Sequence, residues 1–156
     1  MDPAPLSLAD LKGHIQRELR NNPFLDLNRS APRVLVVVGT RPEGIKLAPV
    51  VAALAVRSDE VETRVALTGQ HGDLLDQVLD VFSLRTDWDL GIMREGQDLY
   101  DVAHGCLDGL RDVVREFHPD IVLVQGDTAT VFLASLVAFF ERTRVGHVEA
   151  GLRSHD

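Results

Sequence analysis

The sequence predicts an α/β fold in which a Rossmann-like parallel sheet carries helices on both faces. From Arg33 onward, short valine-rich runs of strand length occur at 34–38, 61–67, 121–124 and 145–148. Longer segments with helical periodicity separate these runs. Strands of a parallel sheet covered on both faces read as continuous apolar runs, and crossover helices join them. Both observations favour this architecture.

The N-terminal part of the chain differs from the rest. Prolines recur within residues 1–32, and only the segment 7–19 has the pattern of a helix there. The 156 residues are 45% hydrophobic and 26% charged, which is the composition of an ordinary globular protein with one main domain. We therefore divide the chain into an arm with a short helix and a linker, 1–32, and a Rossmann-like domain, 33–156.

Crossover helices are expected between the strands. The first is predicted at 45–56, where Pro49 is tolerable only near the first turn. The second is predicted at 72–82. The third, at 99–117, is the clearest, because its apolar residues recur at steps of three and four. Cys106 lies on that apolar face, so we expect a buried structural thiol and not a nucleophile.

The fourth helix, at 128–140, is apolar on nearly every side and must be covered on more than one of them. A sheet of only four predicted strands would nevertheless leave an apolar edge and a face of this helix exposed. We therefore expect self-association or poor solubility of the chain.

The charge balance restricts the partners. With 24 acidic and 16 basic residues, the formal charge of −8 argues against a broad surface for nucleic acid or anionic lipid. The N-terminus lacks the basic start and apolar core of a secretory signal. The longest apolar run, 131–140, is shorter than the about 20 residues that span a bilayer. These features predict a cytoplasmic protein without nucleic-acid or membrane partners.

The stretch "VLVVVGTRPEGIK", 34–46, places charges at the exit of a buried strand. Gly39 permits a sharp turn or a close backbone approach, and Arg41 and Lys46 lie near a helix N-terminus that attracts anions. A tight turn with two solvated cations is the alternative, but cations there oppose the helix dipole. The spacing matches neither a P-loop nor G-x-G-x-x-G, so a Mg-dependent phosphate site and a dinucleotide site are disfavoured.

Two carboxylates follow later strands. Asp127 comes after Gly126 and before a helix, so by itself it is best explained as an N-cap. Glu149 ends the last strand, where Arg153 four positions later is a possible ion-pair partner. The carboxyl ends of parallel strands meet at one edge of a sheet, so these carboxylates and the two cations of the first loop are expected to converge. Such a set fits proton transfer on a phosphorylated small molecule.

The histidines give weaker signals. His71 follows the second strand and either lines the same cleft or simply begins a helix. A metal site built from His147, Glu149, His155 and Asp156 is conceivable, but the set lacks the spacing of a familiar ligand group. We expect no metal.

Five segments resemble, in the same order, N-terminal motifs of the non-hydrolysing UDP-N-acetylglucosamine 2-epimerases. The match covers 33–156, and its segments are "VLVVVGTRPEGIKLAPVVAAL", "TGQHGDLLDQVLDVF", "DWDLGIMREGQDL", "PDIVLVQGDTAT" and "VGHVEAGLRSHD". The resemblance implies an incomplete N-terminal half of a glycosyltransferase-B-like fold, with the active site in a cleft between two Rossmann-like halves. It also implies that UDP-N-acetylglucosamine and UDP-N-acetylmannosamine are interconverted by elimination and re-addition of UDP, without a cofactor.

The matching motifs imply roles for individual residues. Arg41 and Lys46 are expected to steady the departing diphosphate, and Asp127 and Glu149 to transfer protons at C2 or to hold the sugar. Gln70 and His71 match a region that binds a second, regulatory substrate molecule in some bacterial members. The full substrate-binding set implied is Gly39, Arg41, Lys46, Gln70, His71 and Arg153.

The sequence departs from the family pattern in two ways. Gly44 stands where the family usually has alanine, and the chain stops before the second domain, which supplies most of the uridine site. We therefore expect an N-terminal portion that is inactive alone, in a pathway to cell-surface polysaccharide. It would form a homo-oligomer or associate with a C-terminal half or a full-length relative. A catalytically silent nucleotide-sugar-binding or interaction module, or a glycosyltransferase half-domain, are the alternatives.

Overall fold

The computed structural model describes residues 31–69, 81–82, 84–92, 94 and 96–151. The chain divides into two units, Met1–Ser30 and Ala31–Asp156, and every described residue belongs to the second. The predicted helix at 7–19 and nearly all of the one at 72–82 lie outside the described residues.

In the described part of the chain, five parallel strands form one sheet in the order β3-β2-β1-β4-β5. The central strand β1 places Val36 opposite Val65 of β2 and opposite Leu123 of β4. After β1, the chain adds β2 and β3 on one side of it and then β4 and β5 on the other side. The topological switch point, where open sheets of this kind bind ligands, thus lies between β1 and β4. The strands are β1 (Arg33–Val38), β2 (Glu62–Leu67), β3 (Trp88–Asp89), β4 (Ile121–Gln125) and β5 (Arg144–Val148).

The four predicted strands are confirmed as β1, β2, β4 and β5, and so is the parallel α/β class. The sequence analysis missed β3. This strand has two residues, and only Ala66 and Leu67 of β2 pair with it, so no apolar run marks its position.

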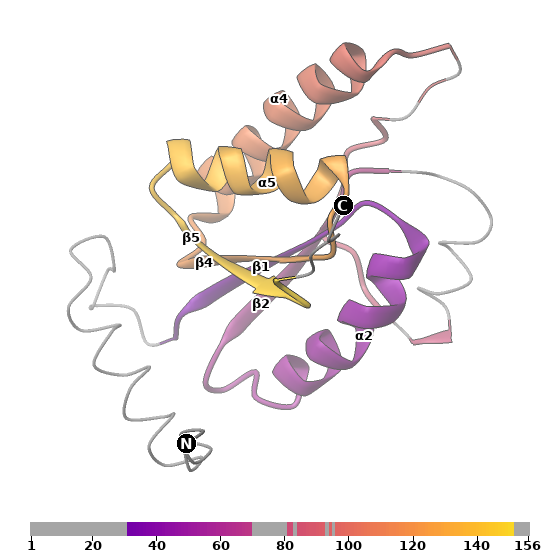
Figure 1. The fold of residues 1–156 in the computed structure, drawn as a ribbon. Helices are drawn as coiled ribbons and strands as arrows, with labels where there is room; N and C mark the ends of the chain where they lie inside the picture. Colours follow the sequence, from indigo (N-terminus) through magenta and orange to yellow (C-terminus); the bar gives the residue numbers. More distant parts are fainter. Residues whose placement is uncertain (1–30, 70–80, 83, 93, 95, 152–156) are drawn as a thin grey trace, which may run out of the picture. The chain divides into compact units, whose positions relative to one another are not determined.

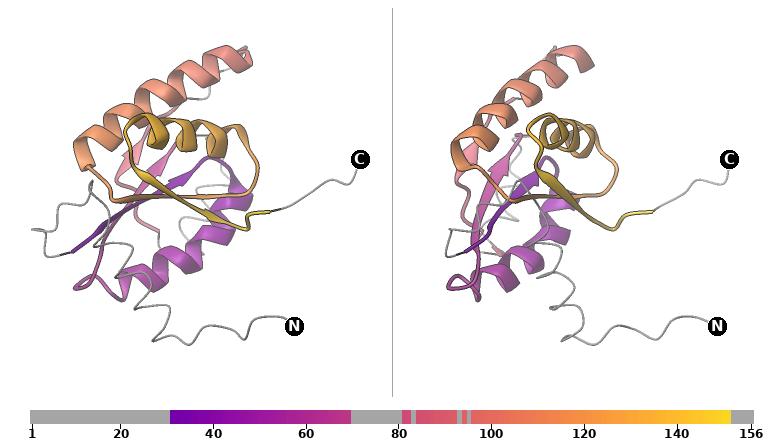
Figure 2. Two further views of the ribbon diagram at one scale, coloured as in Figure 1. Left: turned by 60° about the vertical axis from the view of Figure 1, so that its left-hand side comes forward. Right: turned by 90° about the vertical axis from the view of Figure 1, so that its left-hand side faces the viewer.

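Helices cover both faces of the sheet, as predicted. Helix α2 (Arg41–Ala55) lies on one face, and α4 (Leu99–Phe117) and α5 (Ala129–Phe140) lie on the other (Figures 1 and 2). No helix within the described part of the chain combines the length and apolar character needed to cross a membrane.

Helix α2 begins four residues earlier than the sequence analysis expected. Thr40 is its N-cap, and the Glu43 carboxylate accepts a hydrogen bond from the Thr40 N–H at 3.2 Å. This capping starts the helix at Arg41 and places Pro49 well inside it. The expectation that Pro49 is tolerable only near the first turn is therefore wrong. Pro49 lies on the exposed side of the helix.

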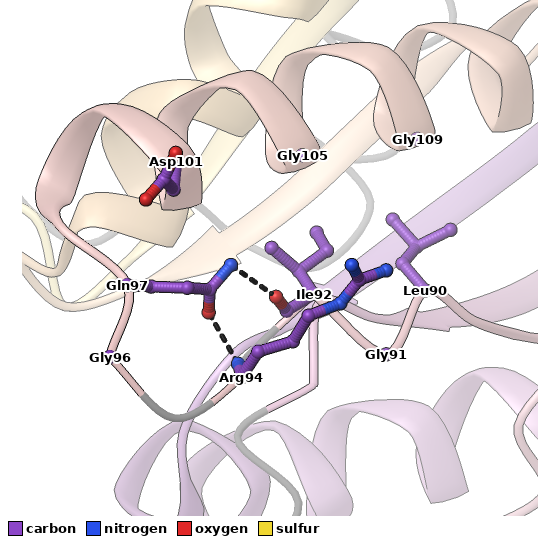
Figure 3. A pocket seen from close by; sticks show the side chains of 9 residues that line it. All are labelled: Leu90, Gly91, Ile92, Arg94, Gly96, Gln97, Asp101, Gly105 and Gly109. Carbon is purple, nitrogen blue, oxygen red and sulfur yellow. Dashed lines mark hydrogen bonds between the residues drawn. The ribbon is translucent and has the colours of Figure 1, made fainter.

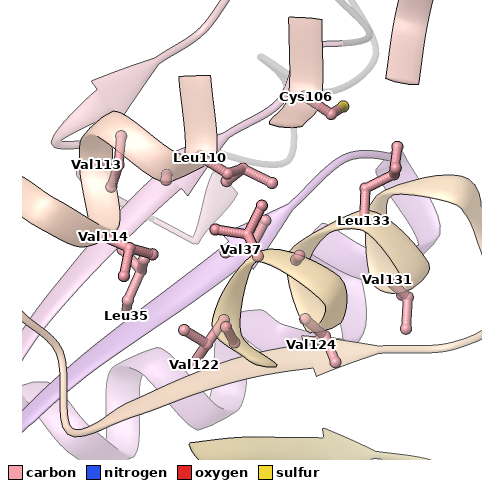
Figure 4. Close-up of a cluster of buried hydrophobic side chains, with 14 of the residues drawn as sticks. Leu35, Val37, Cys106, Leu110, Val113, Val114, Val122, Val124, Val131 and Leu133 are labelled. Atoms are coloured by element: carbon pink, nitrogen blue, oxygen red, sulfur yellow. The ribbon is translucent and has the colours of Figure 1, made fainter. Parts of the chain in front are cut away.

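The larger core cluster fills the space between the sheet and helices α4 and α5 (Figure 4). Leu35 and Val37 of β1 contribute to it, whereas Val36 belongs to a second cluster on the α2 face. Successive residues of a strand point to opposite faces, so a strand buried on both sides is apolar at every position. Cys106 is buried in the larger cluster, and burial raises the pKa of its thiol to about 11. The expectation of a buried structural thiol is confirmed.

Among the described residues, helix α5 is covered on one face only. Its residues Val131, Leu133, Ala134, Val137 and Ala138 pack into the core. Phe132, Phe139 and Phe140 are 66%, 74% and 64% exposed. Within the described residues, the prediction of cover on more than one side is thus wrong, and the expected exposed helix face is present.

Candidate functional site

Three loops meet at the carboxyl edge of the sheet. Gly39 lies in the β1–α2 turn and Arg41 directly follows that turn as the first residue of α2, while Asp127 lies in the β4–α5 turn and Glu149 follows β5. A cavity of about 160 Å³ opens at the switch point between the first two turns. The described lining of this cavity consists of Gly39, Thr40, Thr68, Leu99, Val102, Cys106, Thr128, Ala129 and Thr130.

The clearest link between these loops is the ion pair of Lys46 with Glu149. The Lys46 ammonium on α2 donates to Glu149 Oε2, and the Gln125 amide at the end of β4 donates to the same oxygen. The hydrogen bond from Lys46 lowers the pKa of Glu149, and the charge of Lys46 and the Gln125 bond act in the same direction against desolvation. Glu149 is therefore held as a carboxylate beside an ammonium, at a sheet edge that water reaches.

Glu149 has an uncommon backbone conformation. Its φ is 60°, in the left-handed region that residues other than glycine, asparagine and aspartate adopt rarely. Strained backbone conformations of this kind concentrate at functional sites. They can orient a side chain in a direction that a regular strand does not allow. Here it accompanies a carboxylate that reaches Lys46 and Gln125.

Another carboxylate, which is buried, lies beneath the first turn, and the sequence analysis assigned it no role. The Glu43 side chain is 1% exposed. Its Oε2 accepts from the Gly39 N–H at 2.6 Å, and its Oε1 accepts from the Thr128 hydroxyl at 2.7 Å. The N–H groups of Gly39 and Thr40, which the sequence analysis associated with an anion site, are thus already bonded to the protein's own carboxylate. The pattern T-x-x-E at 40–43 was the available signal, since it is a capping-box signature.

Arg41 and Asp127 lie at the same edge and are exposed. Neither side chain forms a hydrogen bond or ion pair with another described residue. The N-cap of α5 is Thr128, whose hydroxyl accepts from the Val131 N–H at 3.4 Å. The N-cap explanation of Asp127 is therefore wrong by one position, and the Asp127 carboxylate is left without a capping role.

Gly39 is required by packing. A Cβ at this position would lie 2.1 Å from Thr130 Oγ1, because the β1–α2 turn passes directly over the first turn of α5. Thr130 in turn shares a hydrogen bond of 3.0 Å with the hydroxyl of Thr68 at the end of β2. The turn that carries Arg41 is thus seated on two neighbouring loops.

The structure describes only some of the remaining residues that the sequence analysis discussed. Gln70, His71 and Arg153 lie outside the described residues. The possible Glu149–Arg153 pair is therefore not described, and Glu149 bonds to Lys46 instead. His147 Nε2 lies 2.6 Å from the Gly126 carbonyl oxygen, which can only accept, so this ring nitrogen carries the proton. Among the described residues, no group of three His, Cys, Asp or Glu side chains is arranged to hold a metal ion.

A separate cavity of about 540 Å³ lies beside α4 (Figure 3). The Gln97 amide joins two other lining residues, donating to the Ile92 carbonyl at 2.9 Å and accepting from the Arg94 N–H. A Cβ at Gly105 would lie 2.7 Å from the Ile92 side chain, so this glycine lets the loop approach the helix closely. Neither Lys46 nor Glu149 is among the described residues that line this cavity. We therefore take the sheet edge as the candidate site.

The arrangement at the edge combines groups that can move protons with groups that stabilise anions. Glu149 and Asp127 are carboxylates, and Arg41 and Lys46 are cations on the first two turns of one helix. Positioned carboxylates serve as general acids or bases, and cations stabilise the charge that develops on a departing phosphate. The sequence analysis also missed Gln125, a buried amide at the end of β4 that donates to Glu149.

Comparison with known protein families agrees with this assignment. The sequence model of a family described as UDP-N-acetylglucosamine 2-epimerase matches residues 52–156. The UDP-N-acetylglucosamine 2-epimerase of Yersinia pestis is 54% identical over 124 residues, which are 80% of this chain and 33% of the relative. The Escherichia coli K12 protein of the same name is 52% identical over 124 residues, again 80% of this chain and 33% of the relative. The chain thus spans about a third of the length of the curated relatives that it matches.

Solved structures give the same result. The UDP-GlcNAc 2-epimerase of Neisseria meningitidis bound to UDP-GlcNAc has a TM-score of 0.74 and 47% identity, covering 80% of this chain and 34% of that one. The Methanocaldococcus jannaschii enzyme in complex with UDP-GlcNAc and UDP has a TM-score of 0.73 and 33% identity, with 80% and 34% covered.

Proposed function

The chain belongs to the UDP-N-acetylglucosamine 2-epimerase family, and from this premise we propose that it supplies part of the active site of such an epimerase. The enzyme would interconvert UDP-N-acetylglucosamine and UDP-N-acetylmannosamine. A base takes the C2 proton, the C2–H electron pair forms a C1=C2 double bond, and the C1–O bond breaks with its electron pair going to UDP. In the reverse sense, the double-bond pair takes a proton at C2 from the other face and a UDP oxygen bonds to C1. The chain spans about a third of its relatives, so we propose that it is inactive alone.

The observation that supports this proposal most is the contact of Lys46 with Glu149 across 103 positions of sequence. It joins a cation of the first loop to a carboxylate after the last described strand. In the proposed reaction Arg41 and Lys46 stabilise the leaving diphosphate, and Asp127 and Glu149 transfer protons at C2 or hold the sugar. Gly39 gives the turn its shape, and Gln70, His71 and Arg153 complete the proposed substrate contacts.

We propose a cytoplasmic location and a role in making cell-surface polysaccharide precursors. We also propose that the chain associates with a second copy of itself, with a C-terminal portion, or with a full-length relative. The exposed phenylalanines of α5 support such association.

The experiment that tests the reaction is hydrogen exchange at C2. The purified chain is incubated with UDP-N-acetylglucosamine in deuterated water, alone and together with a separately produced C-terminal portion of the Yersinia pestis relative. NMR then reports deuterium at C2 and free UDP. We expect label only in the mixture, and we expect Glu149→Gln to abolish it while Glu60→Gln, at an exposed glutamate of this chain, retains it.

The other outcomes separate the alternatives. Label produced by the chain alone would show that it is active by itself and would exclude a silent module. Failure of the mixture to label C2, with substrate binding retained, would leave a nucleotide-sugar-binding module. Sugar transfer to an acceptor without inversion at C2 would indicate a glycosyltransferase half-domain.

A further inference from the structure

The Glu43 carboxylate connects two loops of the site that are far apart in sequence. It accepts from the N–H groups of Gly39 and Thr40 in the first loop, and from the hydroxyl of Thr128 in the β4–α5 loop. An ordinary capping box joins a side chain only to the start of its own helix. The bond to Thr128 spans 85 positions and therefore does more than cap α2.

These three donors satisfy the hydrogen-bonding capacity of the buried Glu43 carboxylate. The side chain is 1% exposed, and no cation contacts it among the described residues. All three of its partners donate, which suits an ionised carboxylate, since that group only accepts. Its position in the first turn of α2 adds the favourable end of the helix dipole. The described hydrogen-bond donors to this buried carboxylate all belong to these two loops, so its bonds hold the loops in fixed positions.

We propose that Glu43 is a positioning residue, which holds the loop of Arg41 and the loop of Asp127 in register with each other. Arg41 follows Thr40, whose N–H the carboxylate binds, and Asp127 precedes Thr128, whose hydroxyl it binds. The bonded groups are thus the immediate chain neighbours of two proposed site residues. This inference rests on the proposed function only for its consequence on substrate binding, because the contact between the loops is independent of any ligand.

The consequence for the substrate is specific. The Gly39 and Thr40 N–H groups are engaged by Glu43, so a diphosphate at this edge is bound by the side chains of Arg41 and Lys46 and not by the backbone of the turn. Loss of the Glu43 charge or of the Thr128 hydroxyl then displaces one loop relative to the other without removing any group that touches the substrate.

The test compares Glu43→Gln, Thr128→Val and Thr128→Ser with the unchanged chain, and uses Glu60→Gln as the matched charge control. Amide hydrogen exchange by NMR is read in the loop that was not altered. We expect Glu43→Gln to speed exchange in residues 126–130, and Thr128→Val to speed it at Gly39 and Thr40. Thr128→Ser keeps the hydroxyl and should restore slow exchange, and Glu60→Gln should change neither loop.

Changes confined to the altered loop would overturn the proposal, and so would equal effects of Thr128→Val and Thr128→Ser. If Glu43→Gln does not fold, the two Thr128 variants decide the question by themselves.

Titration of the same proteins, each mixed with the C-terminal portion described above, with UDP-N-acetylglucosamine separates this inference from the proposed function. We expect Glu43→Gln and Thr128→Val to weaken binding by about tenfold, which corresponds to about 1.4 kcal/mol or one charge-assisted hydrogen bond. Unchanged binding in variants with loosened loops would overturn the positioning role and leave the proposed function intact. No binding by the unchanged chain mixed with the C-terminal portion would count against the proposed function, and the exchange data would still decide whether Glu43 joins the loops.

Discussion

Single residues at the sheet edge owe their environment to neighbours that are distant in sequence. Glu149 has a left-handed backbone and bonds to Lys46 and Gln125, which lie on a helix and on the adjacent strand. Glu43 is buried by the loops that it bonds. The two carboxylates thus have different properties. Glu149 faces solvent and is available to a ligand, whereas Glu43 is enclosed and holds the surrounding backbone.

The first prediction concerns the charge of Glu149. Replacing Lys46 by methionine removes the hydrogen bond that lowers the pKa of Glu149, so this pKa should rise towards the ordinary glutamate value of about 4.3. A carboxyl group with a lowered folded-state pKa stabilises the fold above its unfolded pKa, and this contribution disappears as the pH falls through the folded pKa. The Lys46 pair should therefore persist at neutral pH and break only in acid.

NMR titration of the Glu149 side-chain carboxyl carbon measures this pKa in the two proteins. Arg57→Met, which removes an exposed cation beyond the end of α2, serves as the control and should leave the Glu149 titration unchanged. Coincident titration curves for Lys46→Met and the unchanged chain would contradict the contact.

Individual elements show how far amphipathic pattern determines packing. In α4 the apolar residues at steps of three and four place Cys106, Leu110, Val113, Val114 and Phe117 in the core. Helix α5 is apolar throughout, so its pattern does not identify which side faces the sheet. The contacts with β4 and β1 decide that Val131 and Val137 are buried and that Phe132 and Phe139 are not.

The second prediction compares two leucines of α4. Leu110 is fully buried and Leu99 is 80% exposed. Leu110→Ala removes packed methyl groups and leaves a cavity, so we expect it to lower the free energy of unfolding by about 2–5 kcal/mol. Leu99→Ala should change it by less than about 0.5 kcal/mol. Urea unfolding followed by circular dichroism measures both values, and similar effects of the two substitutions would show that α4 does not pack through this face.

The third prediction concerns the exposed face of α5. The rings of Phe139 and Phe140 lie in contact, with centroids 6.1 Å apart, and Phe132 is exposed on the same helix. We expect the chain to self-associate through this face, and Phe132→Ser combined with Phe139→Ser to reduce the association. Light scattering over a range of concentrations measures it.

Val56→Ser is the matched control, because Val56 is 85% exposed at the end of α2, on the opposite face of the sheet. A monodisperse monomer at every concentration of the unchanged chain would contradict self-association. Equal association of the control and the double variant would place the contact elsewhere.

The molecule as a whole combines an open parallel sheet with a strongly acidic composition. The order β3-β2-β1-β4-β5 places the switch point beside the Gly39 turn, and the net charge is −8. The cations of the site are thus a local exception within a negative molecule. We therefore expect an anion bound by Arg41 and Lys46 to be small enough to avoid the acidic surface, as the proposed nucleotide sugar is, and we expect no binding of a nucleic-acid duplex.

The fourth prediction follows from this charge. The chain should not retard a DNA duplex in a gel at low salt, where non-specific electrostatic binding is strongest. A salt-dependent shift at micromolar protein would contradict the assignment of the cations to a small ligand. The same duplex with a basic DNA-binding protein provides the positive control.

The sequence by itself determined the parallel α/β class, four of the five strands, helix α4 and the meeting of charged loops at one edge. Apolar periodicity reports which positions are buried, and parallel strands necessarily end together, so these features need no knowledge of the partners. The tertiary structure decided the rest. Strand β3 forms because it pairs with the edge of β2. Helix α2 begins at Arg41 because Glu43 takes part in its capping box, and Thr128 holds the N-cap position of α5 that was expected of Asp127. Contacts such as Lys46–Glu149 and Glu43–Thr128 depend on strand register and loop packing across about a hundred positions, which local pattern does not encode.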